Sequence, residues 1–257
     1  MVVAVLQYQT MFVTRQFNIE NMTPAWLLPI YPLIVTGPLA AAIVAKVEPE
    51  AARTIWVAGV SSQGLGWCVA VFMYAMWCIR LLCEEIPEPK ERPGMFIAVG
   101  PTGALCLFLS NRLCMGGGLQ AYFGRLGYTA QGIIALGTSA AKGLPNPFLG
   151  QPPAAAAQIV TVVAVIAGTF LWLLCFWWFA LSTAAIVQGR RGLEVNVTLW
   201  SFIFPNAGLV LATIQLGKAY DSPAILWLTS VMTGVLFVGW VVVGLCLLNA
   251  ARKGKLS

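Results

Sequence analysis

Histidine is absent from this sequence, and charged residues of any kind are scarce. Only 9% of the 257 residues are charged, whereas soluble domains carry roughly 25%. Without histidine, every catalytic dyad or triad that depends on an imidazole is excluded. The seven cysteines form no Cys-x-x-Cys pair, so the usual ligands of a zinc site are missing as well. We therefore expect neither an enzyme nor a protein with a metal or other cofactor, and the mean hydropathy of +0.82 indicates an integral membrane protein.

Long apolar runs are abundant, and none of them has a carboxylate at its centre. Crossing a bilayer takes about 20 residues, and the segments that meet this length are 26–45, 55–82, 95–115, 159–187, 195–216 and 225–248. All nine acidic residues lie at the ends of these segments or between them. Cation-coupled carriers usually place ionisable groups within the membrane, so this absence argues against a cation pathway. The net charge of +6 has two interpretations: cytoplasmic loops that follow the positive-inside rule, or a field that favours an anionic substrate.

The chain is predicted to form one all-α transmembrane domain over residues 1–257. Residues 1–15 are interpreted as the remnant of a preceding helix, because their apolar run is too short to cross a membrane. Residues 116–156 are rich in glycine, proline and small residues, which favours a long loop with at most a short interfacial helix. Counting Lys and Arg on the two sides gives nine against six, which places the C-terminus in the cytoplasm and this loop on the opposite side.

Proline is missing from three of the predicted spans and present in the three that alternate with them. Within a helix, Pro205 would leave the carbonyl of Ser201 without its donor, and Pro101 would do the same to Ile97. Such groups are tolerated in a membrane where they face protein or a water-filled cavity. The proline-bearing spans are therefore predicted to be inner helices that line a passage, with the other three as an outer wall. The alternative is that the prolines simply kink packed helices. The predicted pore-lining and kink residues are Pro29, Pro32, Gly37, Pro38, Gly100, Pro101, Thr102 and Pro205.

The polar side chains of these inner spans suit an anion, which needs hydrogen-bond donors along its path. The residues predicted to bind it are Ser201, Asn206, Thr213, Asn111 and Arg112. Arg112 and Lys218 stand at span ends, where they could attract an anion. Phe204 directly precedes Pro205, and a ring aimed into a narrow lumen would form a hydrophobic constriction. Packing between helices is the alternative role for this ring.

Four stretches together resemble one family of membrane proteins. They are "MTPAWLLPIYPLIVTG" (22–37), "QGLGW" (63–67), "RPGMFIAVGPTG" (92–103) and "FIFPNAGL" (202–209). They are similar to the fungal malic-acid transport proteins of the tellurite-resistance/dicarboxylate transporter family, whose more distant members are plant slow anion channels and fungal sulfite exporters. The resemblance implies a ring of five helical hairpins, with proline-kinked inner helices around a central pore. In the anion-channel branch a phenylalanine of the ninth helix occludes the pore, and Phe204 is the position that matches it.

The resemblance also sets the functional expectations. It implies transport of organic anions, most simply C4-dicarboxylates such as malate, by a plasma-membrane protein that contacts lipid, assembles as a homo-oligomer (a trimer) and binds no nucleic acid. One alternative is efflux of sulfite or another small anion. By this resemblance the six spans are helices five to ten of ten. The other alternative is therefore a truncated fragment that does not transport.

Overall fold

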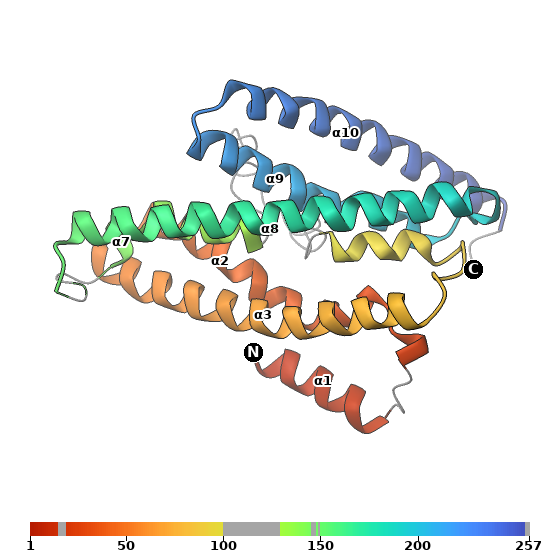
Figure 1. Ribbon diagram of the computed structural model, residues 1–257, viewed down its shortest axis with the longest axis horizontal. Coiled ribbons are helices and arrows are strands. Elements are labelled where there is room, and N and C mark those ends of the chain that lie inside the picture. Colours follow the sequence, from red (N-terminus) through yellow and green to blue (C-terminus); the bar gives the residue numbers. More distant parts are fainter. Residues whose placement is uncertain (15–18, 100–128, 145–147, 149, 255–257) are drawn as a thin grey trace.

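The computed structural model describes residues 1–14, 19–99, 129–144, 148 and 150–254, and within these ranges it holds no β-strand, which confirms the all-α prediction. Figure 1 shows the long helices running roughly along the longest axis of the molecule. With 3-10 helices written η, the elements are α1 (Val2–Thr14), η1 (Ile19–Asn21), η2 (Pro24–Ile30), α2 (Tyr31–Val44), α3 (Pro49–Cys83), η3 (Arg92–Ala98), α6 (Thr129–Thr138), α7 (Ala140–Gly143), α8 (Pro153–Gly189), η4 (Arg190–Gly192), η5 (Val197–Phe202), α9 (Phe204–Ala219) and α10 (Pro223–Arg252).

Five of the predicted spans correspond to helices whose length and apolar composition suffice to cross a membrane. These helices cover Pro24–Val44, Pro49–Cys83, Ala154–Gly192, Val197–Ala219 and Pro223–Arg252. The remaining span, 95–115, lies outside the described residues apart from its first five positions. The predicted site residues that also lie outside them are Gly100, Pro101, Thr102, Asn111 and Arg112.

The prolines mark the points at which a 3-10 helix gives way to an α-helix. η2 is followed directly by α2 and η5 is followed by α9, with Pro32 and Pro205 in the first turn of the α-helix. A proline fits there because its missing N–H would have no partner within the helix. The expectation that Pro205 interrupts a continuous helix therefore needs correction, since α9 begins at Phe204. Pro29 and Pro38, in contrast, lie inside η2 and α2.

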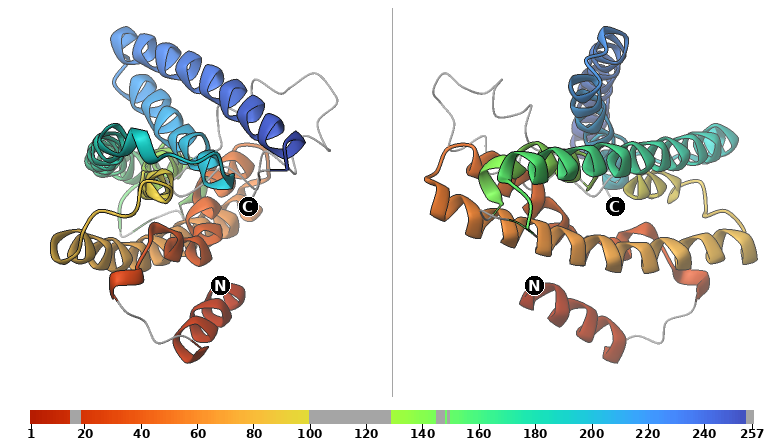
Figure 2. Two further views of the ribbon diagram at one scale, coloured as in Figure 1. Left: turned by 90° about the vertical axis from the view of Figure 1, so that its right-hand side faces the viewer. Right: turned by 60° about the vertical axis from the view of Figure 1, so that its left-hand side comes forward.

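Each proline-bearing segment pairs with a long helix that has its proline only at the first residue. The η2–α2 segment packs against α3, and the η5–α9 segment packs against α10. Both η3 and α6 pack against α8. The described part of the chain thus forms three helical hairpins, with α1 next to η2 at one end of the series (Figure 2).

α6 lies inside the bundle, although it falls within the range 116–156 that the sequence predicts to be a loop. It contacts α2 on one side and α9 on the other, while η3 contacts η2 and η5 in the same order. We therefore describe η3 and α6 together as the third inner segment. Close packing explains why small residues are found here: a Cβ on Gly137 would lie 2.3 Å from the Cβ of Ala164 on α8. The glycines of this segment suggested a loop in the sequence. In the structure they allow α6 to pack closely against a neighbouring helix.

The proline-bearing spans are more deeply buried than the three long helices that pair with them. In the proline-bearing spans that begin at Pro24 and Val197, 56% and 44% of the most apolar stretch is buried. In α3, α8 and α10 the buried share falls to 22%, 11% and 6%. These three helices leave large apolar side chains exposed, among them Phe72, Phe170 and Trp227. Exposed apolar faces of this size are expected to contact lipid.

Candidate functional site

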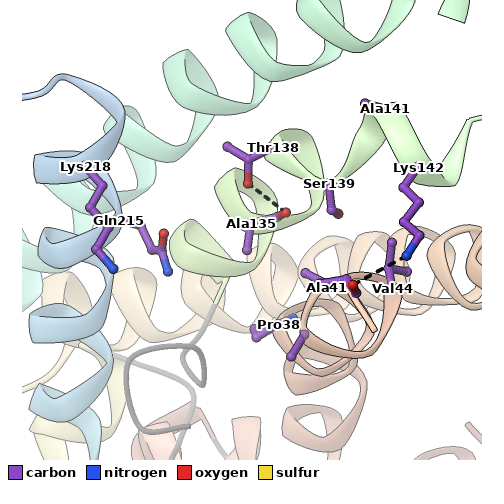
Figure 3. Close-up of a pocket in the computed structure, with 12 residues that line it drawn as sticks. Pro38, Ala41, Val44, Ala135, Thr138, Ser139, Ala141, Lys142, Gln215 and Lys218 are labelled. Atoms are coloured by element: carbon purple, nitrogen blue, oxygen red, sulfur yellow. Dashed lines mark hydrogen bonds between the residues drawn. The ribbon is translucent and has the colours of Figure 1, made fainter. Parts of the chain in front are cut away.

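A cavity of about 350 Å³ lies where the three inner segments end, at the end of the bundle that carries α7 (Figure 3). α2 contributes small apolar side chains, including Pro38 and Ala41, and α6 contributes Ala135 and Thr138. The last turn of α9 completes the lining with Lys218 and the neighbouring Gln215. All three inner segments therefore meet at one cavity.

The cavity is positively charged. Lys142 of α7 and Lys218 of α9 line it, and no carboxylate is among its lining residues in the described part of the chain. The Lys142 ammonium donates a hydrogen bond to the carbonyl of Ala45, with 3.4 Å between nitrogen and oxygen. The ammonium group of Lys218 makes no hydrogen bond or ion pair with the residues that the structure describes. Two cations without carboxylate partners favour an anionic ligand.

Only one of the two lysines at the cavity was predicted from the sequence to attract an anion. Lys218 is expected to attract an anion because it stands at a span end, and the structure places it at the cavity. Lys142 was missed because its segment reads as a loop. The signal that could have found it is the uncharged stretch "TAQGIIALGTSAA" directly before it, which is apolar enough to pack as a buried helix. Pro38 is the one predicted pore-lining residue of the described chain that borders this cavity.

Phe204 lies at the opposite end of α9, at the junction with η5. Its half-buried ring stacks on Trp200, with centroids 5.4 Å apart and planes 28° apart. Because an α-helix rises 1.5 Å per residue, Phe204 and Lys218 are separated by about 21 Å along α9. The predicted gate and the basic cavity are therefore two distinct places on one inner helix.

The side-chain amide of Asn206 is hydrogen-bonded to a backbone carbonyl of the preceding turn. Its side-chain amide donates to the carbonyl of Phe202 over 2.8 Å, and its Oδ1 atom is buried with no partner among the described residues. The carbonyl of Phe202 lies three residues before Pro205, which has no N–H to offer a 3-10 bond. Asn206 also borders an apolar cavity between α8, α9 and α10 rather than the cavity of the lysines. The sequence predicted that the Asn206 amide would contact an anion. In the structure this amide donates to the backbone carbonyl of Phe202.

Tyrosines from other parts of the chain supply donors to carbonyls of η2 and η3. The Tyr8 hydroxyl donates to the carbonyl of Trp26 over 3.0 Å. The Tyr31 hydroxyl donates to Ile97, the carbonyl that Pro101 is predicted to leave free, over 2.8 Å. The Tyr74 hydroxyl donates to Ala98, one residue further on, over 3.1 Å. Protein groups thus satisfy these carbonyls, as a membrane interior requires.

Two further predicted residues, Thr213 and Gly37, lie at contacts between helices. Thr213 is fully buried, accepts a hydrogen bond from the Trp172 indole of α8 over 2.8 Å and donates to the carbonyl of Leu209. Gly37 lies against Gln63 of α3, since a Cβ on this glycine would lie 1.3 Å from the side-chain oxygen of Gln63. Ser201 is half-buried near the end of η5.

Replacing Asn206 by leucine should lower the thermal unfolding midpoint of the purified protein. The Phe202 carbonyl would lose its side-chain donor, and an unsatisfied buried acceptor costs about 1–3 kcal/mol. Circular dichroism at the helix band would record the midpoint. Ser230→Ala is the control, because this exposed hydroxyl bonds only the carbonyl four residues earlier in α10. Equal midpoints for the two variants would show that the Asn206 bond contributes nothing.

Comparison with known proteins gives consistent matches. A family model described as voltage-dependent anion channel (SLAC1) matches residues 1–248. The malic acid transport protein of Schizosaccharomyces pombe is 28% identical over 240 residues, which are 92% of this chain and 49% of that protein. A putative malic acid transport protein of the same organism is 27% identical over 252 residues, 97% of this chain and 52% of the relative. The sulfite efflux pump SSU1 of Arthroderma benhamiae is 24% identical over 228 residues, 88% of this chain and 53% of the relative. The chain thus spans about half the length of these relatives, and no solved structure matches it.

Proposed function

The chain belongs to the SLAC1 family of voltage-dependent anion channels, and on that basis we propose that it moves small organic anions across a membrane, with C4-dicarboxylates such as malate as substrates. The observation that carries the proposal is the cavity between the inner segments, which holds Lys142 and Lys218 and is lined by no carboxylate in the described residues. The relatives named as malic acid transport proteins favour malate within this class. No catalytic role is proposed.

The proposed path runs along the inner segments. An anion would enter at the cavity of the two lysines, travel beside α9 and meet the ring of Phe204 about 21 Å away. An apolar ring at a constriction stops ions because they lose hydration there. Near this point the inner segment changes from a 3-10 helix to an α-helix at Pro205. The Asn206 amide donates to the carbonyl of Phe202 there, so this carbonyl is not left buried and unsatisfied.

Orientation and surroundings are part of the same proposal. The protein would lie in the plasma membrane with its C-terminus in the cytoplasm, and it would assemble as a homo-oligomer, a trimer by the family resemblance. Support for the orientation comes from the arginines at the ends of α3, α8 and α10, namely Arg80, Arg190 and Arg252. They would be cytoplasmic under the positive-inside rule. The cavity of the lysines would then open on the opposite side.

Sulfite export is the second candidate function. It is favoured by the relatives named as sulfite efflux pumps, of which three are 22–25% identical to this chain. The two lysines would suit an inorganic anion as well as a carboxylate, because both interact with an ammonium group as point charges.

Uptake of labelled malate into liposomes containing the purified chain tests the proposed function. We expect saturable uptake above that of protein-free liposomes, inhibited by unlabelled succinate. Stronger inhibition by sulfite than by succinate would favour the second candidate. The helical content of the reconstituted protein is measured in parallel by circular dichroism. Absence of malate uptake, and of sulfite uptake measured in the same way, in correctly folded protein would overturn transport by this chain alone.

A further inference from the structure

We propose that Lys142 and Lys218 form a two-point site for the two carboxylate groups of a short dicarboxylate, so that they select it over monocarboxylates. The proposal rests on the proposed function and names the feature of the cavity that would set its substrate class. It requires that both lysines face one space, that this space suits a small molecule and that the two charges are not already neutralised by the protein.

The two lysines reach the same cavity from different elements. Lys218 belongs to the last turn of α9, and Lys142 belongs to α7, which follows α6. Figure 3 shows them on opposite sides of the cavity, with Gln215 beside Lys218 and the short side chains of Ala135 and Ala41 further along between them. An anion with one charged end could contact one ammonium group. An anion with two charged ends would contact both once the flexible lysine side chains turn toward each other across the cavity.

The size of the cavity suits a small diacid. Its volume of about 350 Å³ lies near the lower end of small-molecule pockets, which span about 300–1,000 Å³. Alanines at positions 41, 42, 45, 135 and 141 leave this space open, because none of them extends beyond its Cβ. The hydroxyls of Thr138 and Ser139 border it but donate to the backbone carbonyls of Ala135 and Leu136 in α6. Among the residues that line the cavity, the two lysines are thus the charged groups available to a ligand.

The charges of the two lysines are not neutralised within the described chain. The Lys142 ammonium donates to the neutral carbonyl of Ala45, and the Lys218 ammonium has no hydrogen-bond or ion-pair partner among the described residues. By contrast, Lys90 in the connection between α3 and η3 forms an ion pair with Glu88 over 2.8 Å. A dianion bridging the cavity would give each ammonium group the partner that the protein itself does not provide.

Calorimetric titration of the purified chain with succinate and with butyrate tests the site. Both acids have four carbons, and at neutral pH only succinate carries two charges. We expect the chain to bind succinate more tightly. Lys142→Gln and Lys218→Gln should each weaken succinate binding about twofold to fivefold with a smaller effect on butyrate. The double variant should bind the two acids equally.

Lys46→Gln is the matched control, since it removes the same charge at the same end of the bundle from a residue that does not line the cavity. Lys142→Arg and Lys218→Arg should keep the preference for succinate and show that the variants fold. Equal losses for succinate and butyrate, or an equal effect of Lys46→Gln, would overturn the two-point site. Liposome flux without any dependence on the two lysines would overturn the site and leave the proposed function standing. Lysine-dependent succinate binding without flux would support the site and count against transport.

Discussion

Replacing Phe204 by alanine should raise anion flux through the protein several-fold. The ring stands at the junction of η5 and α9, half-buried and stacked on Trp200, and by the proposed path it is the apolar barrier between the two ends of the passage. Removing it would widen the constriction and let the ion keep more of its hydration. Anion currents across planar bilayers, or efflux from preloaded liposomes, would measure the change.

Phe202→Ala is the control for this experiment, since it removes the same side chain two positions earlier. The Phe202 ring packs on Phe96 with centroids 5.1 Å apart, within an apolar cluster that also contains Trp77 and Trp178. Because the ring is only partly buried, its loss should lower stability by less than the roughly 3–5 kcal/mol of a fully buried aromatic ring, and it should not increase flux. If Phe204→Ala leaves flux unchanged or lower in folded protein, the ring only packs against Trp200.

Replacing Gly59 by alanine should markedly destabilise the protein, whereas Gly64→Ala on the same helix should not. A Cβ on Gly59 would lie 2.3 Å from the Cβ of Ala40 on α2. The Ala40 methyl is fixed to its backbone and cannot rotate away, so α2 and α3 would have to separate. Overpacking of this kind costs about 1–3 kcal/mol. Because α2 contributes Ala41 to the basic cavity, anion binding should weaken as well.

Gly64 supplies the comparison for the Gly59 variant because a Cβ there meets nothing within 4 Å. The alanine should be neutral or stabilising by up to about 1 kcal/mol, the difference in helix propensity between the two residues. Tryptophan fluorescence during thermal unfolding of the purified variants would give both midpoints. Similar shifts for Gly59→Ala and Gly64→Ala would mean that α2 and α3 are not in close contact at this glycine.

Much of the architecture can be predicted from the sequence. The all-α class and five helices long and apolar enough to span a membrane follow from the apolar runs, because a lipid-embedded backbone must satisfy its hydrogen bonds within a helix. The resemblance carried by four short stretches is confirmed by the family match over residues 1–248. The two described proline-bearing spans are also the more buried ones, since helices that interrupt their hydrogen bonding need protein neighbours.

The candidate site was harder to predict, as Asn206 and Lys142 illustrate. A buried asparagine in an apolar span suggests a ligand, but whether its amide meets a ligand or a carbonyl depends on the backbone of Phe202 at the proline junction. Lys142 follows a stretch whose glycines read as a loop, and only the neighbouring helices decide that this stretch is packed as α6. Local composition carries no information about such partners.

The sequence by itself determined that this protein is a bundle of membrane helices with alternating proline-bearing and proline-free spans, because run length and proline chemistry act locally along the chain. Tertiary structure alone decided which donors satisfy the carbonyls near the prolines, with Tyr31 reaching Ile97 across 66 positions of sequence. It also decided that Lys142 and Lys218 line one cavity. Hydrogen bonds and charge clusters of this kind join residues far apart in the chain, so they exist only once the hairpins have packed.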